Sequence, residues 1–171
     1  VGLAVVRALE ACGTLEVGLT WPNDILHCGR KLGGILVELH SEAGAAGAVI
    51  GIGLNLAMPP DFDTKSTIAL VPTALENILS PCPDRLAVLV ALLRELARCL
   101  SRFTRDGLAP FLADWQARNV WRDQAVNLVR DERVSAQGIC RGVDLDGALL
   151  VETAAGVQRF LSGDLSIRAI A

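Results

Sequence analysis

The sequence predicts an α+β protein in which a mixed sheet packed with helices is followed by a small SH3-like β-barrel. Two stretches carry apolar residues at helical spacing, and the segment between them alternates in the manner of short strands. From residue 124 onward, short strands separated by turns return. We therefore place two units in the chain, a first unit over 1–121 and a second unit over 122–171.

The first unit opens with a helix and continues with strands. Apolar residues at helical spacing over 1–12 stop at Gly13, a residue that commonly ends helices. The strands that follow are separated by turn-forming or small residues. We predict strands at 17–21, 25–28, 31–40 and 48–56, turns at 22–24 and 29–30, and a loop over 41–47.

Helices complete the first unit. A short helix is expected over 73–79, and the longest helix runs from its N-cap Asp84 to Asp106, with Gly107 at its end. A further helical stretch covers 108–118. The apolar stripe of the longest helix is predicted to pack into the core, and it consists of Leu86, Leu89, Val90, Leu93, Leu96, Leu100 and Phe103.

The second unit consists of short strands and turns. A break is expected at 131–132, a hairpin turn at 144–147 and another turn at 154–156. About five strands in so short a segment are typical of a small SH3-like barrel. The predicted strands cover 125–129, 134–140, 148–153, 157–161 and 165–170.

Charge and hydropathy argue against two classes of partner. The formal net charge is −3, and no helix carries a basic stripe, so nucleic acid is not expected as a partner. The apolar stretches are broken by charges well short of the roughly 20 residues that a membrane span requires. We expect a cytoplasmic protein that does not insert into membranes.

The cysteines do not predict a metal site. The chain has 5, an odd number without a C-x-x-C pair or a histidine at a recognisable zinc-ligand spacing. We interpret them as buried or incidental thiols in a reducing compartment, and we assign His27 and His40 to strand surfaces. The cysteines are Cys12, Cys28, Cys82, Cys99 and Cys140.

A candidate site lies in the first strands. Asn23 and Asp24 occupy a turn, and Lys31 begins the strand that a hairpin brings beside them. An ammonium group offsets negative charge on a phosphoryl or acyl oxygen, and a carboxylate can hold Mg²⁺. Period-two alternation sends Lys31, Gly33 and Ile35 to one face of the strand and Leu32, Gly34 and Leu36 to the other.

A neighbouring strand strengthens this assignment. Taken alone, Pro22, Asn23 and Asp24 could form an ordinary turn, because proline, asparagine and aspartate are the residues that turns favour. An isolated lysine is likewise commonly a surface residue. Glycines inside a strand, however, indicate the close approach of another group to the backbone. Alternation places Gly51, Gly53 and Asn55 on a bare face, opposite Ile50, Ile52 and Leu54.

Four segments in order and at matching spacing resemble the biotin protein ligases, enzymes that attach biotin to a carrier domain. The resemblance spans nearly the whole chain and includes its barrel-like end. The segments are Trp-Pro-Asn-Asp at 21–24, Arg-Lys-Leu-Gly-Gly-Ile-Leu-Val-Glu at 30–38, Gly-Ile-Gly-Leu-Asn at 51–55 and Gly-Val-Asp-Leu-Asp-Gly-Ala-Leu-Leu-Val at 142–151.

The resemblance implies a class II synthetase-like catalytic fold and a reaction of biotin with ATP and Mg²⁺. Biotinoyl-5'-AMP forms, and the activated carboxyl group passes to a lysine of the biotin carboxyl carrier domain of acetyl-CoA carboxylase. Homodimerisation stays open.

The resemblance also implies roles for individual residues. Lys31 contacts the biotin carboxyl group and the phosphate, as a catalytic residue. Asp24, also catalytic, positions Mg²⁺. Gly34 and Leu36 line the biotin pocket, whereas Asn23, Gly53 and Asn55 border the adenylate; Asp164 and Arg168 approach the nucleotide or form a structural ion pair.

Parts of the family pattern do not occur in these 171 residues. The Gly-Arg-rich loop that closes over the adenylate and the Ser-Thr segment that binds the ureido ring are both missing. We therefore expect an N-terminally truncated ligase that is not active alone, with one apolar face of its sheet uncovered. A lipoate ligase, and a non-catalytic remnant that binds a carrier domain, are the alternatives.

Overall fold

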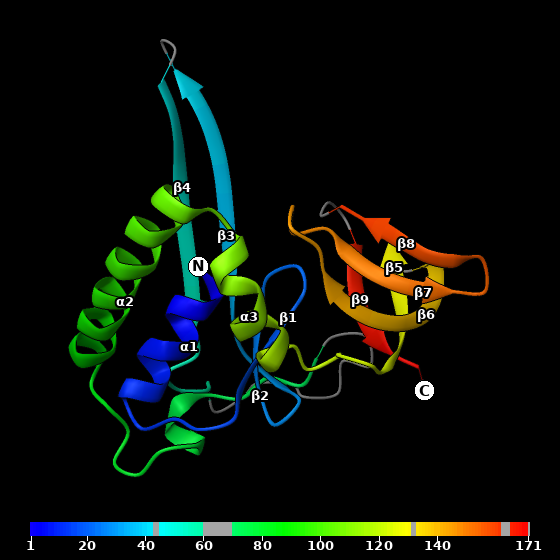
Figure 1. Ribbon diagram of the computed structural model, residues 1–171. Coiled ribbons are helices and arrows are strands. Elements are labelled where there is room, and N and C mark those ends of the chain that lie inside the picture. The colour runs from blue at the N-terminus through cyan, green and yellow to red at the C-terminus, as the bar shows by residue number, and fades with distance from the viewer. Residues whose placement is uncertain (43–44, 60–69, 131–132, 162–164, 171) are drawn as a thin grey trace.

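Figure 1 shows two β-sheets, with the α-helices gathered beside the first sheet. The computed structural model describes residues 1–42, 45–59, 70–130, 133–161 and 165–170. The first sheet and its helices comprise α1 (Gly2–Ala11), β1 (Val17–Thr20), β2 (Asp24–His27), β3 (Arg30–Glu42), β4 (Ala45–Leu54), the 3₁₀ turn η1 (Leu75–Asn77), α2 (Arg85–Asp106), the 3₁₀ turn η2 (Ala109–Phe111) and α3 (Leu112–Arg118). The second sheet comprises β5 (Ala125–Arg130), β6 (Arg133–Val143), β7 (Leu149–Thr153), β8 (Gly156–Phe160) and β9 (Leu165–Ala169).

The first sheet has the strand order β1-β2-β3-β4, and each strand pairs antiparallel with the next. Short connections between consecutive strands favour this pairing. The α+β class is confirmed. Among the described residues, the parallel component expected of a mixed sheet is limited to two isolated bridges, Leu19–Asn119 and Lys31–Pro72.

The β3–β4 hairpin is longer than the sequence predicts, and in Figure 1 it projects beyond the helices. The prediction of a loop over 41–47 is wrong, because Ser41 pairs with Ala46 and His40 pairs with Gly47. Small residues are compatible with a paired strand as well as with a loop. Composition alone therefore could not place the turn.

Helix α1 supplies the centre of the first core. Its apolar residues surround the helix, so it is buried on several sides rather than along one stripe. It packs against α2 and against the inner face of the sheet. The buried members of this cluster include Leu3, Val5, Val6 and Leu9 from α1, with Val17, Leu19, Ile25 and Leu32 from the strands.

Helix α2 begins and ends where the sequence predicts. The Asp84 carboxylate accepts hydrogen bonds from the backbone amides of Leu86 and Ala87 at 2.8 and 2.9 Å. The chain leaves the helix at Gly107, whose φ of 69° favours glycine. Within the described part of the chain, no helix combines the length and the apolar character needed to cross a bilayer.

The prediction that the apolar stripe of α2 packs into the core is wrong for most of its members. The buried face of α2 instead carries Val88, Leu92 and Cys99, and of the predicted stripe Leu96 packs against the core. The helix has two apolar faces, and only one of them faces α1. The exposed members are Leu86, Leu89, Val90, Leu93, Leu100 and Phe103, with exposed fractions between 38% and 67%.

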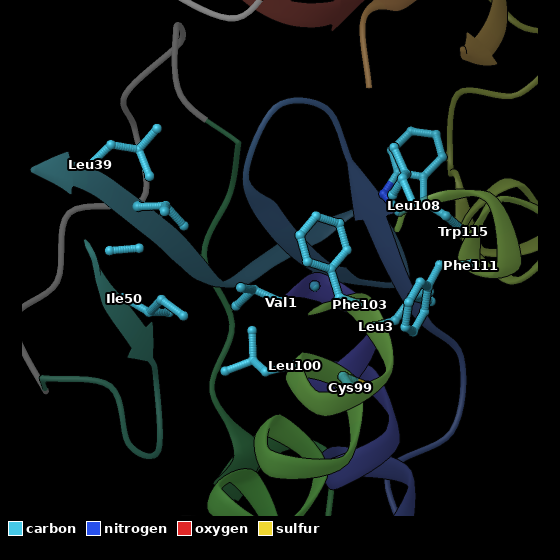
Figure 2. A pocket seen from close by; sticks show the side chains of 13 residues that line it. Val1, Leu3, Leu39, Ile50, Cys99, Leu100, Phe103, Leu108, Phe111 and Trp115 are labelled. Atoms are coloured by element: carbon cyan, nitrogen blue, oxygen red, sulfur yellow. The ribbon is translucent and has the colours of Figure 1, made fainter. Parts of the chain in front are cut away.

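The uncovered apolar surface continues from α2 onto the β3–β4 hairpin. Figure 2 shows side chains from α2, the hairpin and the η2–α3 segment around one apolar cavity of about 470 Å³. Leu39 and Ile50 lie on the hairpin side of this cavity, and Leu100 and Phe103 lie on the α2 side. Leu39 is 83% exposed, so much of this surface is open to solvent.

The second sheet has the order β8-β7-β6-β5-β9, and all its pairs are antiparallel. The predicted strands and the turn at 144–147 are confirmed, whereas 131–132 lie outside the described residues. The expected barrel is not closed, because no pairing among the described residues joins the edge strands β8 and β9. Its core contains Val126, Leu128, Cys140, Leu149, Val151, Leu165 and Ile167.

Trp21 joins the two sheets. Its ring is buried among the core residues of the second sheet, although it belongs to the turn after β1. Its indole nitrogen donates a hydrogen bond to the carbonyl oxygen of Gly147 at 3.2 Å. The β6–β7 turn therefore holds the start of the predicted site. The boundary between 1–121 and 122–171 stays a prediction.

Candidate functional site

The site is built on the turn that follows Trp21. The backbone oxygen of Asn23 accepts a hydrogen bond from the amide of Ile35 at 2.9 Å, and the Asn23 side-chain amide donates to the Ile35 carbonyl at 2.9 Å. These two bonds fasten the turn to β3. Asp24 begins β2 directly beyond the turn and pairs with Gly34.

A β-bulge decides where the lysine points. The β2–β3 register shifts between Ile25 and Leu26, which pair with Gly33 and Lys31, so that Leu32 is the extra residue. An extra residue reverses the alternation of side chains beyond it. The period-two prediction that Lys31 shares a face with Gly33 is therefore wrong.

The bulge places Lys31 on the face of Gly34 and Asp24. The Lys31 ammonium nitrogen lies 2.6 Å from Oδ1 of Asp24, and the lysine side chain is 41% exposed whereas that of Asp24 is 19% exposed. A half-exposed pair contributes little to stability. Its importance here is positional, because it holds a cation at the wall of a cavity.

The backbone of Lys31 is clamped by the segment before η1. Its amide donates to the carbonyl oxygen of Val71 at 2.8 Å, and its own carbonyl accepts from the amide of Thr73 at 2.8 Å. The Arg30 guanidinium donates two hydrogen bonds to the Pro72 carbonyl. The sequence did not predict this clamp, because Lys31 and the segment from Val71 to Thr73 lie about forty positions apart and share no recognisable motif.

Glycines form the open floor of the cavity beside this ion pair. A Cβ atom at Gly53 would meet no protein atom nearer than 4.0 Å, and one at Gly34 would lie 3.5 Å from Oδ1 of Asp24. Gly33 is different, because a Cβ there would collide with the Gly53 carbonyl. The cavity measures about 450 Å³ and is lined by Asn23, Asp24, Lys31, Gly34, Ile35, Leu36, Gly51, Ile52 and Gly53.

A second cavity of about 520 Å³ adjoins the first. The two share Asn23, Asp24, Ile35 and Leu36, and the second extends between the sheets to Trp21 and Trp115. Ligand pockets commonly occupy roughly 300–1,000 Å³. The two cavities together suit an elongated ligand that has a polar portion beside Lys31 and an apolar portion toward the tryptophans.

Two predicted site residues lie outside both cavity linings. The Asn55 side chain donates to the carbonyl oxygens of Lys31 and Thr73 at 3.3 and 3.0 Å, so it braces the lysine from behind. Arg168 lies on β9 and donates to the Ile167 carbonyl at 3.0 Å. Asp164 lies outside the described residues.

The donor set suits Mg²⁺ only when a ligand shares the metal. Among the residues that the structure describes, Asp24 is the single carboxylate that lines the first cavity. Mg²⁺ commonly takes one or two protein carboxylates together with phosphate oxygens and waters. Asp24 therefore fits as one ligand of such a shared site, with Lys31 beside it to offset phosphate charge.

Two family models match the chain in sequence order. Residues 1–55 match the biotin/lipoate A/B protein ligase family, and residues 123–168 match the biotin protein ligase C-terminal domain. Together these segments cover more than half of the chain. The chain belongs to the biotin protein ligase family.

Individual relatives of this ligase family are similar along nearly the whole chain. The bifunctional ligase/repressor BirA of Escherichia coli strain K12 is 34% identical over 98% of the chain, which spans 51% of that protein. The biotin–[acetyl-CoA-carboxylase] ligase of Paracoccus denitrificans is 33% identical over 91% of the chain, which spans 66% of that protein. The chain thus spans about half to two thirds of the length of these curated relatives.

A solved ligase structure agrees in fold. The biotin protein ligase of Aquifex aeolicus in complex with biotin and ATP superposes with a TM-score of 0.83 at 26% identity. The match covers 99% of this chain and 69% of that one. The arrangement of two sheets and their helices is therefore a family arrangement.

Proposed function

We propose that this chain carries one wall of a site that activates biotin with ATP and transfers it to a lysine of a biotin carboxyl carrier domain. The observation that carries the proposal is the Lys31–Asp24 pair at 2.6 Å above a floor of glycines. The Aquifex relative is described with biotin and ATP bound, and the name of the Paracoccus relative specifies acetyl-CoA carboxylase as its acceptor.

The first half-reaction forms biotinoyl-5'-AMP. A biotin carboxylate oxygen attacks the α-phosphorus of ATP, and pyrophosphate leaves. The Lys31 ammonium stabilises the negative charge that develops on the phosphoryl oxygens, and it then contacts the new mixed anhydride. In the second half-reaction a carrier lysine attacks the activated carboxyl carbon, and AMP leaves.

Asp24 and Asn23 organise the nucleotide side. Asp24 would hold Mg²⁺ together with the nucleotide phosphates, and the bound metal would supply positive charge that offsets phosphate repulsion. Asn23 keeps the turn against β3 through its two hydrogen bonds to Ile35. Its side-chain carbonyl oxygen takes no part in these bonds and borders the adenylate. The chain's own contribution is thus to fix the positions of a cation and a carboxylate.

The remaining predicted residues shape the pocket. Gly34 and Leu36 border biotin, and Leu36 lies where the two cavities meet. Gly53 leaves room for the adenylate, since no side chain rises from the floor there. Asn55 acts as a positioning residue behind Lys31, and Arg168 approaches the nucleotide from the second sheet.

We further propose that this wall is not sufficient for catalysis. The first cavity is open to solvent and lined from one side by β2, β3 and β4, and exclusion of water protects a reactive adenylate. The uncovered apolar surface of α2 and the hairpin also fits a missing neighbour. The opposite wall is supplied by residues equivalent to the part of the relatives that this chain does not match.

A chimera tests both halves of the proposal. In it, residues 1–171 replace the matched half of the Escherichia coli relative, and pyrophosphate release is measured with biotin, ATP and Mg²⁺. We expect activity in the chimera and none in the 171-residue chain alone. Equal rates for the two proteins would refute the one-wall proposal, and binding of a carrier domain without any response to biotin would favour a non-catalytic module.

Substitutions in the chimera test the site itself. Lys31→Gln should lower the rate roughly 100- to 1,000-fold, the usual effect of losing one preorganised donor. Arg130→Gln, which removes an exposed cation of the second sheet, should leave the rate unchanged. An unchanged rate in Lys31→Gln would overturn the assigned role of the lysine.

Substitutions at two glycines distinguish an effect on ligand binding from an effect on folding. Gly53→Val places a side chain into open space, so we expect calorimetry to show lost binding of a biotinoyl-adenylate analogue with an unchanged unfolding midpoint. Gly33→Ala collides with the Gly53 carbonyl and should lower the midpoint as well. Full binding by Gly53→Val would exclude the adenylate from this floor, and stronger competition by lipoate than by biotin would reassign the substrate.

A further inference from the structure

Three side chains of different chemistry meet at the tip of the β2–β3 hairpin. The Cys28 thiol donates a hydrogen bond to Oε2 of Glu16 at 3.2 Å, and its sulfur lies 3.9 Å from Nε2 of His27. One ligand atom from each of the three residues lies within 4.8 Å of the others. None of these residues lines either cavity of the biotin ligase site.

Strand pairing accounts for the meeting. Val17 pairs with His27, so Glu16, the residue before Val17, lies beside the end of β2. Cys28 follows His27 directly in the turn. From the sequence we assigned His27 to a strand surface and Cys28 to the incidental thiols, because Glu16 lies 12 residues before Cys28 and this spacing is not a conventional one for metal ligands.

Cysteine is an unusual residue for the backbone conformation of this turn. His27 pairs with Arg30, which leaves Cys28 and Gly29 as a two-residue turn with φ values of 47° and 75°. Such turns need positive φ at both central positions and favour asparagine, aspartate or glycine. Glu16 also has a positive φ, of 57°. Cysteine at this turn therefore departs from turn chemistry while aiming its thiol at a carboxylate and an imidazole.

The separations among the three side chains are near those between the ligands of a tetrahedral zinc ion. Bonds of about 2.3 Å to sulfur and about 2.0–2.1 Å to nitrogen or oxygen put neighbouring ligands roughly 3.3–3.6 Å apart. The Cys28–Glu16 and Cys28–His27 separations of 3.2 and 3.9 Å lie just below and just above this range, and the ligand atoms of Glu16 and His27 lie within 4.8 Å of each other. Thiolate and imidazole ligands favour zinc over magnesium or calcium. The geometry points to a zinc-binding site formed by Glu16, His27 and Cys28, with water as the fourth ligand.

Binding is a proton-for-metal exchange. The Cys28 thiol releases its proton to solvent, and the zinc ion forms bonds to Sγ of Cys28, Nε2 of His27 and a carboxylate oxygen of Glu16. The ion ties the loop before β1 to the β2–β3 turn. This point lies at the opposite end of β2 from Asp24, about 10 Å away at the usual strand rise, so the site is separate from the proposed Mg²⁺ site.

Metal titration of the full chain tests the inference. The protein, kept reduced with a phosphine, competes with a chromogenic chelator for Zn²⁺, and Co²⁺ serves as a spectroscopic substitute. We expect one bound equivalent, a thiolate-to-cobalt charge-transfer band and a rise in the unfolding midpoint with zinc. If the protein competes with the chelator for zinc no better than buffer alone does, and the cobalt band is absent, the inference is overturned.

Matched variants assign the ligands. Cys28→Ser should abolish the cobalt band, and Glu16→Gln and His27→Gln should each weaken zinc binding by more than the roughly 10- to 100-fold that follows loss of a second-shell partner. Cys82→Ser, which removes another exposed cysteine, and His40→Gln should behave like the parent. Circular dichroism without metal verifies that each variant folds. Equal loss in Cys82→Ser and Cys28→Ser would contradict the assignment.

Discussion

The two sheets of this ligase family member differ in how completely they bury their apolar side chains. In the second sheet, strands β5, β7 and β9 alternate between buried and more exposed positions, and arginine–carboxylate pairs cover the outer surface. In the first, most of α1 is buried, yet one face of α2 and much of the β3–β4 hairpin remain uncovered. The first sheet thus leaves an apolar surface on α2 and the hairpin open to solvent, whereas the second sheet buries its core with the help of Trp21 from the first.

The contrast extends to function. The proposed Lys31–Asp24 site lies on the sheet whose helices leave more apolar surface exposed, and the second sheet holds the site's first turn through Trp21. A rigid support beside an open wall is the arrangement expected when catalysis requires closure by a further segment.

Trp21→Ala should have the largest effect. It empties a buried site in the second core and removes the hydrogen bond to Gly147, so we expect a loss of about 3–5 kcal/mol in the free energy of unfolding. Thermal unfolding followed by near-ultraviolet circular dichroism should also separate into two transitions. The control Trp21→Phe keeps most of the packing and should lose only about 1 kcal/mol. A single unshifted transition in Trp21→Ala would show that Trp21 does not join the two sheets.

Asp84→Ala should have an intermediate effect that is confined to the first sheet and its helices. The change removes the acceptor for the amides of Leu86 and Ala87 and should cost about 0.5–2 kcal/mol in urea unfolding. Asp84→Ser restores a capping oxygen and should recover most of the loss. Equal destabilisation by both substitutions would rule out capping as the cause.

Leu93→Ser should change stability by no more than about 0.5 kcal/mol, because its side chain is 58% exposed. The same change should reduce self-association of the isolated chain, measured by sedimentation velocity, since it breaks an apolar patch. Leu92→Ser is the neighbouring control, and its buried side chain should make it clearly destabilising. Similar losses for the two variants would mean that the outer face of α2 is covered.

The smallest effect concerns the pH dependence of the second sheet. The Arg159 guanidinium, together with the amides of Asp146 and Ala148, lowers the pKa of Asp144 from its usual 3.8. A carboxylate with a depressed pKa contributes stability above its unfolded pKa and loses it as the pH falls through the folded pKa. Asp144→Asn should therefore lower the unfolding midpoint at neutral pH, and the difference should vanish in strong acid. A difference that persists there would point to packing rather than charge.

Much of the candidate site could be predicted from the sequence. The Trp-Pro-Asn-Asp turn, the lysine-glycine strand and the bare strand at 51–55 fixed which elements matter, because turn formers and strand glycines have few interpretations when they occur together. The N-cap at Asp84 and the glycine at 107 fixed the ends of α2 in the same local way. These features depend on neighbours along the chain.

Other features depended on neighbours in space. The bulge at Leu32, which turns Lys31 toward Asp24, arises from β2–β3 register, and the clamp from Val71 and Thr73 crosses forty residues. The gathering of Glu16 with Cys28 has the same origin.

The sequence by itself thus determined the element types, their order and the chemical groups available to the site. Tertiary structure alone decided which apolar stripe of α2 is buried, which face Lys31 takes and which polar groups meet. The physical reason is that periodicity specifies that a face is apolar but not what covers it, since burial depends on the partner that packs there.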